Sequence, residues 1–123
     1  YYQKSKLNPN ASPIGCAAYC YDWVKYMYGH NGLTAGAKTY RSANDIKTGC
    51  IVHWKYSDSN QHWFVVASRD GGTIHSFEGN AGGMTRDSTT TYKIKNGVLY
   101  AGNKAIDNKY LYVYDHGKHY KMD

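Results

Sequence analysis

Residues 13–29 read PIGCAAYCYDWVKYMYG, a stretch with helix start and stop signals at its two ends. The Ser12 side chain can accept a hydrogen bond from the first helical N–H groups, and the fixed φ of Pro13 suits the first helical position. Gly29 can adopt the left-handed conformation that ends many helices. The sequence therefore predicts a helix over residues 13–28, around which the rest of the chain is organised.

Apolar side chains recur at three- and four-residue steps within this stretch, which is the spacing of one helix face. The face comprises Cys16, Cys20, Trp23, Val24 and Met27. Asp22 and Lys25 should point away from it. We expect the apolar face to pack against a sheet.

Cys16 falls in the first turn of the predicted helix. Unpaired N–H groups and the positive end of the helix dipole favour a thiolate over a thiol there, and the same N–H groups could hold a developing oxyanion. Cys16 is therefore a candidate nucleophile. The alternative is an ordinary core residue, which is the commoner role of a cysteine on an apolar helix face.

The chain has 123 residues, 41% of them hydrophobic, and a formal net charge of +6 at pH 7. This length suits one hydrophobic core, so we expect a single domain over residues 1–123 and a monomer. No run approaches the ~20 apolar residues of a membrane span, and we expect no membrane insertion. The charge favours polyanionic partners, but the lysines are scattered singly, which argues against nucleic acid. A first residue Tyr1 in place of Met indicates that a leader or an upstream domain has been removed.

Three cysteines cannot all pair with one another. If Cys16 is free, Cys20 and Cys50 either form one disulfide or remain as two buried thiols, and the place of Cys20 on the apolar face favours thiols. The cysteines, with His116 and His119 in the tail, match none of the compact zinc spacings. No phosphate, dinucleotide or calcium motif is present, so we expect neither a metal nor a cofactor.

Beyond Gly29 the chain passes through a Gly- and Asn-rich loop, residues 30–44, with a short helical turn expected near Ala43. Strand patterns and hairpin turns follow, and residues 115–123 form a polar tail. The predicted strands are residues 50–56, 63–68, 73–78, 89–95, 98–101 and 110–114. One helix followed by five or six antiparallel strands is an α+β fold.

Cysteine catalysis needs a histidine as general base and a polar group that orients the imidazole. Among the six histidines (His30, His53, His62, His75, His116 and His119), His62 is favoured because it stands at the entry to the most apolar strand. Glu78 and Asn80 lie at the end of the next strand. Since His62 and Glu78 are about equally far from the turn at Asp70 and Gly71, pairing across this hairpin should bring them together.

Several segments, in order, resemble the CHAP family of cysteine- and histidine-dependent amidohydrolases and peptidases. Gly15-Cys16-Ala17-Ala18-Tyr19, with Trp23 and Gly29, resembles the nucleophile helix of that family. Residues 45–52 (DIKTGCIV), 61–66 (QHWFVV) and 77–80 (FEGN) resemble the strand after the cleft loop, the histidine strand and the acidic and amide motif. Arg86 and Tyr92 stand where related sequences often place an Arg and an aromatic residue. The resemblance covers roughly residues 9–92.

This resemblance implies a papain-like fold and the cleavage of bacterial peptidoglycan, by an amidase or an endopeptidase of the kind found in endolysins. It implies Cys16 as nucleophile, His62 as general base and acid, and Glu78 as orienter, with Asn80 assisting or substituting. It further implies action outside the cell or on the cell wall, with peptidoglycan as the partner. The departures are Gly15, which cannot lend a side chain to the oxyanion hole, and Gln61, where a glycine is common.

Two alternative functions remain open at this point. The helix also resembles that of the peptidases that process bacteriocin leaders, although those place Gly after the nucleophile and Asp-Pro after the histidine strand, where this chain has Ala17 and Glu78-Gly79. A chain with 14 tyrosines could instead be a non-catalytic module that binds the wall or its glycans, with Cys16 as a packing residue.

Overall fold

The computed structural model describes residues 4–79 and 88–117, and its one α-helix within those ranges is α1, Cys16–Tyr28. The end of the helix is as predicted: Gly29 has φ +75° and its N–H bonds the Lys25 carbonyl at 3.0 Å. The predicted start at Pro13 is wrong. The chain turns sharply at Gly15, whose φ of 61° and ψ of −133° suit glycine, so Cys16 becomes the first helical residue.

The sheet in the described part of the chain has eight strands, all paired antiparallel in the order β1-β8-β2-β3-β4-β5-β6-β7. Their bounds are β1 Lys38–Tyr40, β2 Ile51–Lys55, β3 Gln61–Asp70, β4 Thr73–Glu78, β5 Ser88–Lys95, β6 Val98–Ala101, β7 Lys104–Ile106 and β8 Leu111–Asp115. The predicted α+β class is confirmed, whereas five or six strands is too few. β1 and β7 span three residues each, which is too short for a period-two pattern to be recognised.

In the described part of the chain, two short 3-10 helices connect strands: η1, Ala43–Asp45, and η3, Asn108–Tyr110. The first is the helical turn expected near Ala43. It is capped by the Ser42 side chain, which accepts a hydrogen bond from the Asn44 N–H at 3.2 Å. The loop before β2 therefore has regular structure at both β1 and η1.

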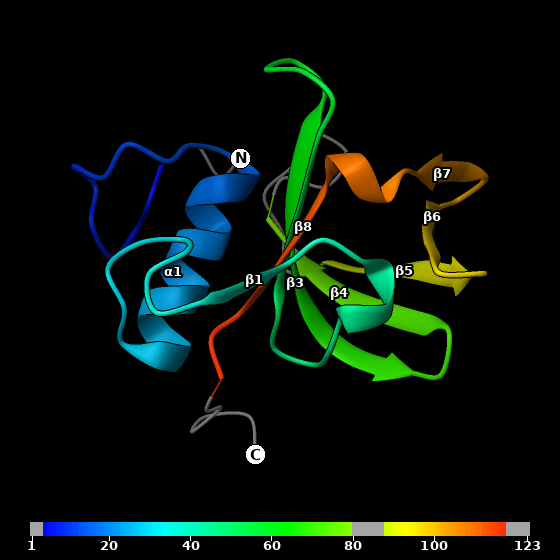
Figure 1. The fold of residues 1–123 in the computed structure, drawn as a ribbon. Helices are drawn as coiled ribbons and strands as arrows, with labels where there is room; N and C mark the ends of the chain where they lie inside the picture. Colours follow the sequence, from blue (N-terminus) through cyan, green and yellow to red (C-terminus); the bar gives the residue numbers. More distant parts are fainter. Residues whose placement is uncertain (1–3, 80–87, 118–123) are drawn as a thin grey trace.

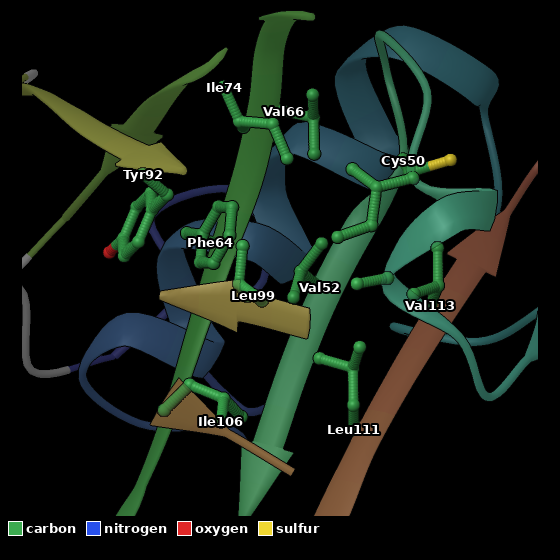
Figure 2. Close-up of a cluster of buried hydrophobic side chains, with 12 residues drawn as sticks. Cys50, Val52, Phe64, Val66, Ile74, Tyr92, Leu99, Ile106, Leu111 and Val113 are labelled. Carbon is green, nitrogen blue, oxygen red and sulfur yellow. The ribbon is translucent and has the colours of Figure 1, made fainter. Parts of the chain in front are cut away.

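The curled sheet divides the core in two (Figure 1). One cluster lies within the curl, where Leu99 of β6 and Ile106 of β7 pack near Val52 and Phe64 of the central strands (Figure 2). The other cluster lies between α1 and the opposite face of β2 and β3, with Val24 against Ile51 and Val65. The helix is thus fixed on the outer side of β2 and β3, and β3 carries the candidate histidine, His62.

The buried face of α1 is broader than predicted. Cys20, Val24 and Met27 are buried as expected, and Asp22, which was expected to point away from this apolar face, is buried as well. The segment that precedes the helix covers it there, because Asp22 accepts hydrogen bonds from the Ser5 hydroxyl and, at 2.8 Å, from the Lys6 backbone N–H. Within the described ranges no helix is both long and apolar enough to span a membrane.

Candidate active site

The Cys16 thiol lies at the first position of α1, half-buried, where three donors converge on it. Burial by itself raises the pKa of this thiol. The His62 side chain opposes this effect through its hydrogen bond and its charge, and the backbone N–H groups of Trp63 and Ala17 oppose it through hydrogen bonds. The pKa of Cys16 is therefore lowered overall. The position thus favours the thiolate, as the sequence suggested.

His62 is the second residue of β3, and its two ring nitrogens face different partners. Nε2 lies 2.5 Å from Oε1 of Glu78, which leaves Nδ1 as the nitrogen that can meet Cys16. Burial opposes protonation of the ring, but the hydrogen bonds and negative charges of Cys16 and Glu78 raise the pKa of His62 to about 9. Both shifts favour the pair of a thiolate and an imidazolium over the pair of a neutral thiol and a neutral ring.

The Glu78 carboxylate is almost fully buried, with 3% of the residue exposed, at the last position of β4. Besides the His62 ring, it accepts hydrogen bonds on Oε2 from the Ser76 hydroxyl and, at 2.6 Å, from the Tyr92 hydroxyl. Burial raises the pKa of Glu78, and these three donors outweigh it, so that the pKa is lowered. A carboxylate held on both oxygens can fix the ring plane of His62.

A β-bulge determines whether His62 and Glu78 share a face of the sheet. Next to the turn, Asp70 pairs with Thr73, and that register continued would set Glu78 opposite Val65, on the face away from His62. A register shift between Val66 and Ser68 adds one residue to β3. Beyond the shift Val65 pairs with Phe77, which sets Glu78 opposite Phe64 and diagonal to His62 on one face.

Gly79 ties this strand end to the helix. A Cβ atom at Gly79 would lie 2.5 Å from the ring of Tyr19, so the aromatic ring packs directly on the backbone after Glu78. Tyr19 belongs to the first turn of α1, three residues after Cys16. The contact therefore sets the distance between the helix that begins at Cys16 and the strand that ends at Glu78.

Sequence reasoning brought together Cys16, His62 and Glu78, and the structure places all three in contact as a line. It did not identify Ser76, and it gave Tyr92 no role. The alternation of Ser76 with Glu78 along β4 could have indicated the first, because residues two apart in a strand share a face. The remaining predicted site residue, Asn80, lies outside the described residues, as does Arg86.

The other cysteines and histidines lie elsewhere. Cys20 and Cys50 are unpaired and buried in different clusters, which excludes a disulfide between them, and burial raises the pKa of both thiols, that of Cys50 to about 11. His53 stacks on Trp63 and His116 on Tyr28. Among residues 4–79 and 88–117 no three His, Cys, Asp or Glu side chains are grouped as metal ligands would be.

A groove of about 350 Å³ opens beside the nucleophile. Its walls include Pro13, Ile14, Cys16, Asp58, Gln61 and Trp63. A second hollow of about 440 Å³ lies around Arg69 and Gly71, at the opposite end of β3. The groove at Cys16 is the candidate substrate site because it alone of the two contains a reactive group.

The N–H groups of Cys16 and Ala17 precede the first hydrogen bonds of the helix, which are donated by Ala18 and Tyr19. Before attack the Ala17 N–H donates to the Cys16 thiolate, but once the sulfur has attacked a carbonyl and lost its charge, both N–H groups can bind the oxyanion on the substrate. The arrangement thus offers a candidate nucleophile, proton carrier, orienting carboxylate and oxyanion donors, which is the set of groups that acyl transfer requires. Comparisons of the chain with protein-family models, with curated proteins and with solved structures find no match.

Proposed function

We propose that this protein is a cysteine-dependent peptidoglycan hydrolase of the CHAP, papain-like type, which cleaves an amide of the bacterial cell wall from outside the cell. The observation that carries the proposal is the contact line from Cys16 through His62 to the buried Glu78. A core cysteine needs no such partners. A helix with the nucleophile at its N-terminus, packed on an antiparallel sheet that carries the histidine, is compatible with a papain-like fold.

The first half of the reaction forms an acyl-enzyme. The Cys16 thiolate attacks the carbonyl carbon of the amide, and the N–H groups at the helix start bind the resulting oxyanion. The C–N bond breaks as His62 gives its proton to the departing nitrogen. A thioester on Cys16 and a free amine result.

The second half releases the acid product. His62, now neutral, takes a proton from a water molecule, which attacks the thioester carbonyl. The S–C bond breaks and the Cys16 thiolate is restored beside the protonated imidazole. Glu78 keeps its charge throughout and holds the ring in the tautomer that both steps need.

Digestion of purified peptidoglycan tests this proposal. The wild-type protein, under reducing conditions, should release new fragments whose masses identify the amide that is cut, and release should weaken at high salt because the positive charge of the protein attracts it to an anionic wall. A protein that binds the wall but releases no fragment would instead support a non-catalytic module. Cleavage of leader peptides with no cleavage of peptidoglycan would support the bacteriocin-processing alternative.

A further inference from the structure

The groove beside Cys16 combines apolar walls with one carboxylate. Pro13, Ile14 and Trp63 supply apolar surface, and Ile14 is 71% exposed although it is a large hydrophobic residue. Among the described residues that line the groove, Asp58 is the one charged side chain apart from the Cys16 thiolate. An acidic group at this place is notable in a chain whose net charge is +6.

The backbone that carries Asp58 is held firmly. The turn between β2 and β3 is closed by hydrogen bonds between Tyr56 and Asn60 at 2.9 Å and between Asn60 and Ser57 at 3.2 Å. The side-chain amide of Gln61 then donates a hydrogen bond to the backbone carbonyl of Asp58 at 3.1 Å. Asp58 therefore keeps a fixed place at the rim of the groove.

The Gln61 side chain is itself oriented by a hydrogen bond to His53. Its Oε1 lies 2.9 Å from Nε2 of the buried His53, whose pKa is lowered by burial, so the neutral ring donates this hydrogen bond. His53 stacks on Trp63 with ring centroids 3.8 Å apart. A continuous set of contacts thus joins Asp58 to Trp63. The backbone N–H of Trp63 in turn donates a hydrogen bond to the Cys16 thiolate.

The ion pair that Asp58 makes with Lys55 can be replaced by a pair with another cation. Lys55 lies 3.0 Å from the carboxylate, but the Asp58 side chain is 95% exposed and that of Lys55 is 44% exposed. Ion pairs this open to water contribute little and compete poorly with a second cation. The carboxylate is accessible to a group that enters the groove.

We propose that the groove selects a substrate with a side-chain amine, whose aliphatic stem lies along Pro13, Ile14 and Trp63 and whose ammonium group meets Asp58. A side chain of the lysine type has this combination, since its stem is apolar and its end is a compact cation. The inference rests on the proposed function, because it places the amine next to the amide that Cys16 attacks. It narrows the substrate to wall peptides with a free amine close to the cut.

Two batches of one peptidoglycan preparation test the proposal: one untreated and one with its free amines blocked by acetic anhydride. Wild-type protein should digest the untreated batch about two- to fivefold faster, the effect of one exposed ion pair. Asp58→Asn should lose this preference and digest the acetylated batch at least as fast as the untreated one. Asp70→Asn, a matched loss of an exposed carboxylate at the far end of β3, should keep the wild-type preference.

The outcomes are distinguishable. Acetylation leaves the wall more anionic and so strengthens its general attraction to this basic protein, which works against the predicted preference. Equal wild-type rates on both batches, or a preference that persists in Asp58→Asn, would overturn the role of Asp58 and leave the hydrolase standing. Failure of the wild type on both batches would overturn the proposed function and this inference with it. The fragment masses show whether the nearby amine is a side-chain or a chain-terminal group.

Discussion

Replacing Cys16 with alanine should lower the rate of peptidoglycan digestion on the order of 10⁴-fold or more, while the protein remains folded. The variant keeps His62, Glu78 and the N–H groups of the helix start, but it has no atom that can form the acyl-enzyme. Because Cys16 is only half-buried and stands at the end of α1, its truncation leaves no large cavity. The measurement is the release of soluble fragments over time, with thermal unfolding followed in parallel.

Cys50→Ala is the matched control for the loss of one sulfur atom. Cys50 is fully buried in the cluster within the curl of the sheet. This variant should therefore lose about 1 to 2 kcal/mol of the free energy of unfolding and unfold at a lower temperature. Below that temperature it should digest the wall at the wild-type rate. Substantial digestion by Cys16→Ala would rule out the thiol mechanism.

Replacing Glu78 with glutamine should slow digestion at about pH 8 by roughly 10- to 100-fold and shift its pH dependence. The carboxylate accepts from His62 on one oxygen and from Ser76 and Tyr92 on the other, whereas an amide offers one oxygen only. One side of the network must then face an NH₂ group. The loss of a buried acceptor should also lower the free energy of unfolding by about 1 to 3 kcal/mol.

The pH profile separates this role from mere destabilisation. In the wild type the rate should fall as the pH rises through about 9, where His62 loses the proton that it gives to the departing amine. Without the Glu78 charge the pKa of His62 drops. The alkaline limb of the profile, where the rate falls with rising pH, should therefore move to lower pH by about one unit or more. A Glu78→Gln enzyme with the wild-type limb would contradict the orienting role.

Stability should follow the same titration. The pKa of His62 is raised in the folded protein, so its contribution to the free energy of unfolding is complete below about pH 6.5 and is lost as the pH rises through about 9.

Tyr92→Phe is the variant to compare with Glu78→Gln, because it removes one hydrogen bond to Glu78 and keeps the charge of the carboxylate. It should lose about 1 kcal/mol of stability and keep its alkaline limb close to that of the wild type.

Local signals in the sequence predicted much of this fold. Gly29 ends the helix as its type suggests, and the strand bounds 73–78 and 98–101 agree with β4 and β6. The start of α1 was misplaced because Ser12 and Pro13 are good starting residues, while the conformation of Gly15 depends on where the chain comes from. The burial of Asp22 was not predicted, because only the tertiary path of the residues before the helix shows which part of the chain covers it.

The candidate site was predictable in its residue types and less so in its geometry. Counting residues from the hairpin turn suggested that His62 and Glu78 are neighbours, but their common face depends on the bulge between Val66 and Ser68, for which the sequence has no local signal. The second support of Glu78 comes from Tyr92 on β5, and this pairing depends on the register of two strands across a long connection. Side-chain networks of this kind follow from the assembled sheet.

Alkylation of the wild-type protein tests the central claim most directly. Iodoacetamide at about pH 6.5 should label Cys16 alone, because its pKa is lowered, whereas those of Cys20 and Cys50 are raised. Mass spectrometry gives the fraction of Cys16 labelled, and the rate of peptidoglycan digestion is measured on the same samples. The rate should fall in proportion to that fraction and reach zero when labelling is complete. Digestion that continues in fully labelled protein would contradict the account.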